Sequence, residues 1–176
     1  MANFTGKSIL ICGVGGQGTL LMSKTLTAGL VQAGYDVKMS EVHGMAQRGG
    51  SVSTQVRYGE KVHSPIIGRG EADVLVAFEK LEGARYSELL KRGGTALIND
   101  YEVMPLPVSS GAADYPQNIY KEMREAFDLR VIPASAIAKS LGNIRCTNIV
   151  LLGALVRAFG LESIDWNAAL AASVPP

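Results

Sequence analysis

Residues 40–51 gather more chemically capable side chains than any other part of the sequence. The segment reads Ser-Glu-Val-His-Gly-Met-Ala-Gln-Arg-Gly-Gly-Ser and holds a carboxylate, an imidazole, an amide and a guanidinium among three glycines. A connection between two elements needs only a few residues, and glycine is used where the backbone adopts unusual angles or approaches another group closely. This composition predicts a segment that binds a ligand or docks against a partner.

The polar side chains of this segment indicate different roles. The Arg48 guanidinium offers a planar, bidentate fork to a carboxylate or phosphate, and an ion pair with Glu41 inside the segment is the alternative. His43 is of the type that relays protons near neutral pH, but a histidine hydrogen-bonded between subunits is the commoner case. None is placed to be a catalytic acid, base or nucleophile. The other candidate binding residues here are Gly44, Gln47, Gly49, Gly50 and Ser51.

A glycine-rich turn is the second candidate site. It matches G-x-G-x-x-G between a predicted strand and a predicted helix, and Glu41 follows twenty-three residues after its last glycine. In dinucleotide-binding folds such glycines allow a tight turn and approach of a pyrophosphate, while the acidic residue binds a ribose hydroxyl. The turn also suits another anion, a partner's carbonyl group or helix packing alone, so these interpretations stay open. Its candidate residues are Gly13, Gly15, Gly16, Gln17 and Gly18.

The hydrophobic pattern predicts the elements that position these residues. A strand at 8–12, a helix at 19–32 and a strand at 36–40 form a βαβ unit with a right-handed crossover. Residues 51–58 alternate as a half-buried strand does, and 72–78 form the continuous apolar run of a central strand. Next come a helix at 81–92 closed by Gly93-Gly94, a strand at 95–99, an extended excursion at 101–116, a helix from 117 and a strand at 129–132. The fold class is α/β, a three-layer Rossmann-like domain with a mostly parallel or mixed central sheet.

The last part of the chain raises two expectations. The helix at 147–159 is apolar on nearly all sides, so it is buried either in the domain or in a subunit contact, and the contact is preferred. Through that face the isolated chain is expected to form a homodimer. The chain ends at Val174-Pro175-Pro176 after a short helical pattern, which predicts one domain spanning 1–176 that lacks its C-terminal tail.

Composition excludes several classes of function. With 176 residues, 19% charged residues and a net charge of +1, the chain has no electrostatic signature for nucleic acid or a membrane surface. No signal peptide or membrane span is present, so a cytoplasmic location is expected. Cys12 and Cys146 are far apart and lack metal-ligand spacing, which predicts free thiols and no iron–sulfur cluster or zinc site of its own.

Taken together, the glycine turn and residues 41–51 resemble the gamma-type domain of the 2-oxoacid:ferredoxin oxidoreductase family. The run His-Gly-Met-Ala-Gln-Arg-Gly-Gly is most similar to the small subunits of its indolepyruvate-type members. Similarity continues through residues 62–67, 70–73 and 148–153, so it covers nearly the whole chain.

The resemblance implies a subunit of an enzyme that oxidatively decarboxylates 2-oxoacids, arylpyruvates among them, to acyl-CoA and reduces ferredoxin. It places thiamine diphosphate, Mg²⁺ and 4Fe-4S clusters in a larger partner subunit, with coenzyme A as co-substrate of the complex. Arg48 is then the first choice to anchor coenzyme A or a partner carboxylate, and the chain alone is expected to be inactive. The alternatives are a free-standing nicotinamide- or flavin-binding reductase that uses the glycine turn, and a structural adaptor without a ligand.

Overall fold

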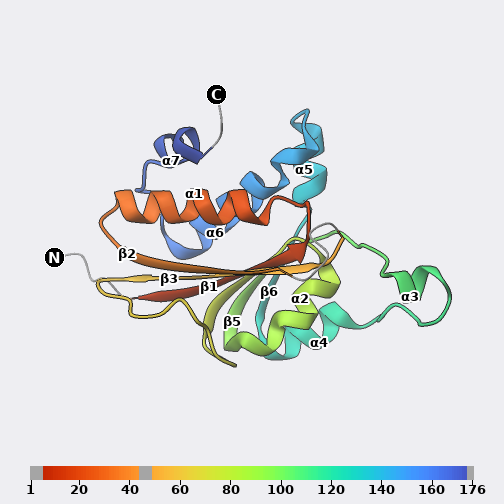
Figure 1. Cartoon of the computed structure of the whole chain (residues 1–176). Helices are drawn as coiled ribbons and strands as arrows, with labels where there is room; N and C mark the ends of the chain where they lie inside the picture. Colours follow the sequence, from red (N-terminus) through yellow and green to blue (C-terminus); the bar gives the residue numbers. More distant parts are fainter. Residues whose placement is uncertain (1–5, 44–48, 174–176) are drawn as a thin grey trace.

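A six-stranded mixed sheet lies between two layers of helices in the computed structural model, which describes residues 6–43 and 49–173 (Figure 1). The strand order is β2-β3-β1-β4-β5-β6. The strands are β1 (Lys7–Val14), β2 (Asp36–His43), β3 (Ser51–Gly59), β4 (Ala72–Ala77), β5 (Leu90–Asn99) and β6 (Asp128–Ile132). The predicted three-layer α/β class is confirmed.

The β3 strand changes the topology expected from the sequence. Strands β1, β4, β5 and β6 are parallel, whereas β3 is antiparallel to both β1 and β2. Strands β1 and β2 therefore run in the same direction but are not neighbours, because β3 lies between them. Since β3 is largely buried and β2 only partly so, the polar strand takes the edge of the sheet.

Helices cover both faces of the sheet (Figure 1). One layer contains α1 (Thr19–Gln32), α5 (Ala134–Ser140), α6 (Thr147–Phe159) and α7 (Trp166–Ser173), and is called here the α1 face. The opposite layer contains α2 (Lys80–Tyr86) and α4 (Ile119–Ala126) and is called the α2 face. Short 3₁₀ turns lie at η1 (Ser87–Leu89) and η2 (Ile144–Cys146), and the four-residue α3 (Leu106–Ser109) stands away from the end of the sheet.

Each face has its own apolar core, because successive strand residues point to opposite sides. In β1, Ile9 and Ile11 face α1 and α6, whereas Leu10 and Cys12 lie in the cluster that includes α2 and α4 residues. The preference for a subunit contact at α6 is wrong. Its apolar side chains are buried against this chain's own sheet, namely Leu151, Leu152, Leu155 and Val156. A helix that packs between a sheet and neighbouring helices needs apolar side chains on most of its sides, and this explains the pattern of α6.

Two local predictions need correction. The helix predicted at 81–92 stops at Tyr86, and β5 already begins at Leu90, a buried residue paired with Ala72. Gly93 and Gly94 therefore do not close a helix but lie inside β5, where Gly93 has a φ of 72° beside a register shift. The second correction concerns β2, which continues to His43 and not to Ser40 as predicted.

The excursion at 101–116 contains α3 and a turn directly after it but is otherwise irregular, as its prolines predict. Glu79 holds its two ends. This carboxylate is 1% exposed and accepts hydrogen bonds from the Val103 amide at 3.2 Å and the Tyr115 hydroxyl at 3.3 Å. It also caps α2 by accepting from the Glu82 amide at 2.8 Å. One buried carboxylate thus fixes both the start of α2 and the root of the excursion.

Candidate functional site

The turn between β1 and α1 has a geometry that requires its glycines. Gly16 and Gly18 have φ values of 103° and 89°, in the left-handed region that favours glycine. A Cβ on Gly13 would lie 2.7 Å from the Gln17 Oε1 and 2.9 Å from the Phe78 Cβ. The Gln17 side chain folds back under the turn, where its Oε1 accepts a hydrogen bond from the Val14 amide at 2.7 Å. Gln17 therefore shapes the turn through its carbonyl oxygen.

The two candidate segments meet at this turn. The Gly15 amide donates to the Gly50 carbonyl at 2.8 Å, and the Gly49 amide donates to the Gly15 carbonyl at 3.3 Å. Ser51 then points to the α2 face, where its hydroxyl donates to the Glu82 carboxylate and lies 3.2 Å from the Tyr86 hydroxyl. Three predicted residues, Gly44, Gln47 and Arg48, lie outside the described residues, and so does any Arg48 ion pair.

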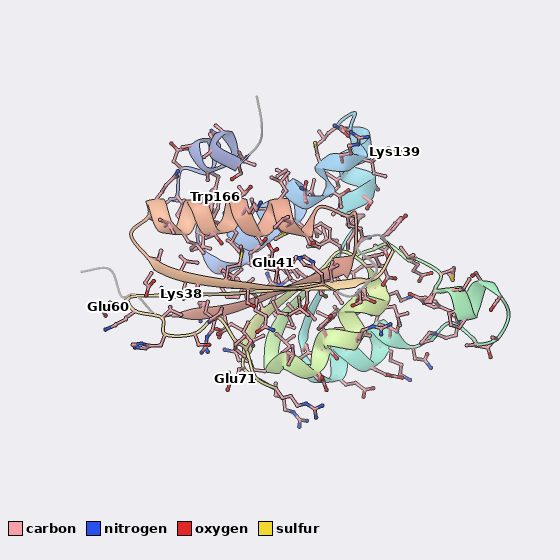
Figure 2. The ribbon with its side chains drawn as sticks, in the orientation of Figure 1. Lys38, Glu41, Glu60, Glu71, Lys139 and Trp166 are labelled. Carbon is pink, nitrogen blue, oxygen red and sulfur yellow. The ribbon has the colours of Figure 1, made fainter. Side chains whose placement is uncertain are left out.

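Glu41 and His43 lie at the end of β2, on the same side of the strand as Val37 and Met39, which pack against the core of the α1 face (Glu41 is labelled in Figure 2). The His43 Nε2 is 3.3 Å from one Glu41 carboxylate oxygen. The other Glu41 oxygen is buried and has no hydrogen-bond partner among the described residues. Because β3 separates β2 from β1, Glu41 lies about 10 Å from β1, two strand spacings across the sheet. This differs from the dinucleotide fold, in which the strand bearing the ribose-binding acid adjoins β1.

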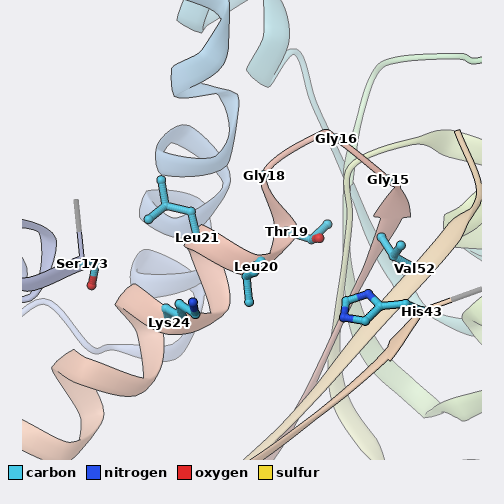
Figure 3. Close-up of a pocket in the computed structure, with 10 residues that line it drawn as sticks. All are labelled: Gly15, Gly16, Gly18, Thr19, Leu20, Leu21, Lys24, His43, Val52 and Ser173. Atoms are coloured by element: carbon cyan, nitrogen blue, oxygen red, sulfur yellow. The ribbon is translucent and has the colours of Figure 1, made fainter. Parts of the chain in front are cut away.

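A cavity of about 580 Å³ opens between the glycine turn, the first turns of α1 and the end of β2 (Figure 3). Lys24 and His43 are its basic side chains, and Leu20, Leu21 and Val52 contribute apolar wall. The remaining lining residues are Gly15, Gly16, Gly18, Thr19 and Ser173. The α1 helix starts here at Gly18 without a side-chain cap, so its first amides also face this end. This cavity suits an anionic ligand that carries an apolar part.

Sequence reasoning missed part of this cavity. Lys24, Leu20, Thr19 and Ser173 were not among the candidate binding residues. Leu20 and Lys24 are four residues apart, which places them on one face of α1 directly after the glycine turn. That spacing was a usable signal for Lys24. Ser173 gave none, because only the packing of α7 on α1 brings it to the cavity.

The two cysteines have different surroundings. Cys12 is buried on the α2 face, and burial together with the nearby Glu82 and Glu79 carboxylates raises the pKa of its thiol. Cys146 is exposed just before α6. Among residues 6–43 and 49–173 no group of three or more His, Cys, Asp or Glu side chains could hold a metal ion. Within the same ranges no helix has the length and apolar character needed to span a membrane.

Comparison with known proteins agrees with the class that this geometry defines, an α/β domain whose glycine turn is joined to a second loop. The family model for pyruvate ferredoxin/flavodoxin oxidoreductase matches residues 8–176. The chain is 39% identical to indolepyruvate oxidoreductase subunit IorB of Pyrococcus horikoshii, covering 96% of this chain and 87% of that protein. Identity to the subunit of the same name from Thermococcus kodakarensis is 41%, with the same coverage.

Among solved structures, the gamma subunit of a keto/oxoacid ferredoxin oxidoreductase from Geobacter sulfurreducens has a similar fold. Its TM-score is 0.66 at 24% identity, over 97% of this chain and 87% of that one. The chain belongs to the pyruvate ferredoxin/flavodoxin oxidoreductase family, and it is an oxidoreductase subunit. The resemblance seen in the sequence is confirmed.

Proposed function

We propose that this chain is the small subunit of a cytoplasmic indolepyruvate or arylpyruvate:ferredoxin oxidoreductase. The supporting observation is about 40% identity, over almost the full length of the chain, to subunits named for indolepyruvate. In this proposal a larger partner subunit carries thiamine diphosphate, Mg²⁺ and the 4Fe-4S clusters, and the complex passes electrons to ferredoxin. The chain has no catalytic residue of its own and is inactive alone.

The role of the chain within the complex is to bind coenzyme A beside the glycine turn. Support comes from the cavity of about 580 Å³, which combines basic and apolar walls and has the size of a small-molecule site. Lys24 pairs with a phosphate group, and the free amides of the first α1 turn stabilise the same negative charge. His43 and the apolar side chains contact the less polar part of the coenzyme. Arg48 lies in the sequence between β2 and β3, and each of these strands contributes a residue to the cavity lining, His43 and Val52.

The first test is reconstitution. The untagged chain is co-expressed with a tagged large subunit, and the purified complex is assayed for reduction of a viologen dye that depends on arylpyruvate and coenzyme A. We expect turnover only when both chains are present. Failure of the two chains to co-purify, together with nicotinamide or flavin binding by the lone chain, would instead support the reductase alternative.

A second measurement locates the coenzyme. In the complex, Lys24→Gln should raise the KM for coenzyme A about tenfold with little change in kcat, since one charged contact is worth about 1.4 kcal/mol. Lys121→Gln is the matched control, because Lys121 is an exposed lysine of α4 on the opposite face of the sheet. Equal KM values for the two variants would remove this cavity from the coenzyme site.

A further inference from the structure

A second crevice opens on the other side of the glycine turn. After β1 the chain passes to the α1 face, and after β4 it passes to the α2 face, so the carboxyl ends of these adjacent strands form a topological switch point. In open α/β sheets, ligands characteristically bind at such a point. A cavity of about 200 Å³ lies there, and Gly16 borders both this cavity and the larger one.

The lining of this crevice is drawn from several strand ends along this part of the sheet. Among the described residues it contains one guanidinium, that of Arg145, and no carboxylate. The lining residues are Gly16, Gln17, Phe78, Asn99, Tyr101, Ser135, Ile144, Arg145 and Thr147. Such a lining favours a negatively charged ligand over a cation or a neutral amine.

Several hydrogen-bond donors remain available at this crevice. The Arg145 side chain is exposed and makes no ion pair within the described part of the chain. Gln17 uses its carbonyl oxygen on the Val14 amide, which leaves its NH₂ group as a donor. The Ser135 oxygen accepts from the Asn99 Nδ2 at 2.9 Å, which leaves the hydroxyl proton to donate.

Buried hydrogen bonds of Asn99 order one wall of the crevice. Asn99 is 1% exposed, and its Nδ2 donates to the Phe78 carbonyl at 3.1 Å as well as to Ser135. Its Oδ1 accepts from the Ser135 amide at 3.1 Å. These three bonds fix the ends of β4 and β5 against the start of α5, so the Ser135 hydroxyl is held in place before a ligand arrives.

Size limits the ligand. A volume of about 200 Å³ corresponds to about seven water molecules at their liquid volume of about 30 Å³ each. Coenzyme A is far larger than that. We propose that this crevice is a second ligand site, which binds a small oxyanion, a phosphate or a short carboxylate, with Arg145 as its main anchor. This site is independent of the proposed function, because it needs neither the partner subunit nor the coenzyme.

The test is a titration of the ¹⁵N-labelled chain, followed by amide chemical shifts at constant ionic strength. Inorganic phosphate and acetate are titrated separately, with chloride as the reference anion, so that the two arms distinguish a phosphate ligand from a carboxylate ligand. We expect saturable shifts at Gly16, Gln17, Ser135 and Thr147 for at least one of the two. Arg145→Gln should weaken that affinity at least tenfold, because the guanidinium of the lining is lost.

Arg124→Gln is the matched control, because Arg124 is exposed on α4 and makes no ion pair in the described structure. Its affinity for the anion should equal that of the unchanged chain. Shifts that do not saturate, or an affinity equal in Arg145→Gln and Arg124→Gln, would overturn the proposal. Displacement of the bound anion by coenzyme A from the same residues would overturn the separation of the two sites. None of these outcomes depends on whether the chain assembles with a larger subunit.

Discussion

The two faces of the sheet use polar groups in opposite ways. On the α2 face, Glu79 and Glu82 are 1% and 5% exposed, and each is bound by groups of this chain. On the α1 face, Lys24 and His43 border an open cavity. Hydrogen bonds stabilise these two buried carboxylates, whereas the exposed Lys24 ammonium beside the cavity stays available for a ligand. The polar groups of the α2 face therefore stabilise the fold, whereas those of the α1 face border the cavity beside the glycine turn.

The helices of the α1 face depend on shape more than on polar bonds. Trp166 packs across α1, and its indole Nε1 donates to the Leu161 carbonyl at 2.9 Å (Figure 2). The ring occupies the space above Gly29, where a Cβ would lie 2.6 Å from the Trp166 Cζ3. Trp166, the only tryptophan of the sequence, therefore has a packing role. Because α7 carries Ser173 to the cavity, its docking on α1 also shapes the site.

The strongest test of this contrast is Glu79→Ala. It removes the cap of α2 and both anchors of the excursion, so we expect a loss of about 3 kcal/mol in the free energy of unfolding. Urea denaturation measures this loss, and hydrogen exchange should show faster exchange at the Val103 amide. Glu125→Ala on α4 is the control, since Glu125 is exposed, and it should stay within about 0.5 kcal/mol. Equal stability of the two variants would show that Glu79 does not hold the α2 face.

An intermediate effect is expected from Gly29→Ala on the α1 face. Alanine favours a helix over glycine by about 1 kcal/mol, but here the new methyl group meets the Trp166 ring, so we expect a net loss of about 1 to 2 kcal/mol. Gly153→Ala is the matched control, because Gly153 is an exposed glycine of α6 whose added methyl group would meet no atom of the described residues within 4 Å. That control should gain stability.

Adding Trp166→Leu to Gly29→Ala tests the cause of the loss. If the steric conflict is responsible, the two changes interact, and the double variant is more stable than the sum of the single effects predicts. Thermal unfolding of the four proteins gives the interaction energy. A gain in stability for Gly29→Ala alone would contradict the close packing of α7 on α1.

Local patterns predicted most of the elements but not the neighbours of each strand. The alternation in β3 and the apolar run of β4 depend on consecutive residues, so they were predicted directly. The insertion of β3 between β1 and β2 depends on which strand loses the least apolar burial when it lies at the edge. That comparison involves all strands of the sheet and cannot be made from one segment. The prediction for Gly93-Gly94 was wrong for a related reason. A glycine pair after a helical pattern usually ends a helix, but here the pairing of β5 with β4 places both glycines inside a strand.

The site shows the same division. The glycine turn and the segment ending at Ser51 were found because their chemistry is concentrated in sequence, and the bonds between Gly15 and residues 49 and 50 confirm that they meet. Ser135 and Arg145 went unnoticed because each is an ordinary residue of its own element. Only the tertiary packing of α5 and η2 beside the strand ends brings them to one crevice.

The smallest expected effect concerns Cys12 on the α2 face. Its folded pKa is raised by burial, then by Glu82 and Glu79, above an unfolded value of about 8.5. The preference of the folded state for the neutral thiol therefore adds its full contribution to the free energy of unfolding below about pH 8.5. This contribution falls as the pH rises toward the folded pKa. Linkage gives a loss of about 0.8 kcal/mol between about pH 7 and 9, because the unfolded thiol ionises while the folded one does not. Urea denaturation at the two pH values measures it.

Cys12→Ala should be less stable at neutral pH because it loses packing, but it should lack this alkaline loss. Cys146→Ser, at an exposed position, should keep it. The range up to about pH 9 matters because Tyr58, whose pKa burial raises to about 12, is still neutral there. An alkaline loss of the same size in Cys12→Ala would mean that another group causes it and that the Cys12 thiol is not its source.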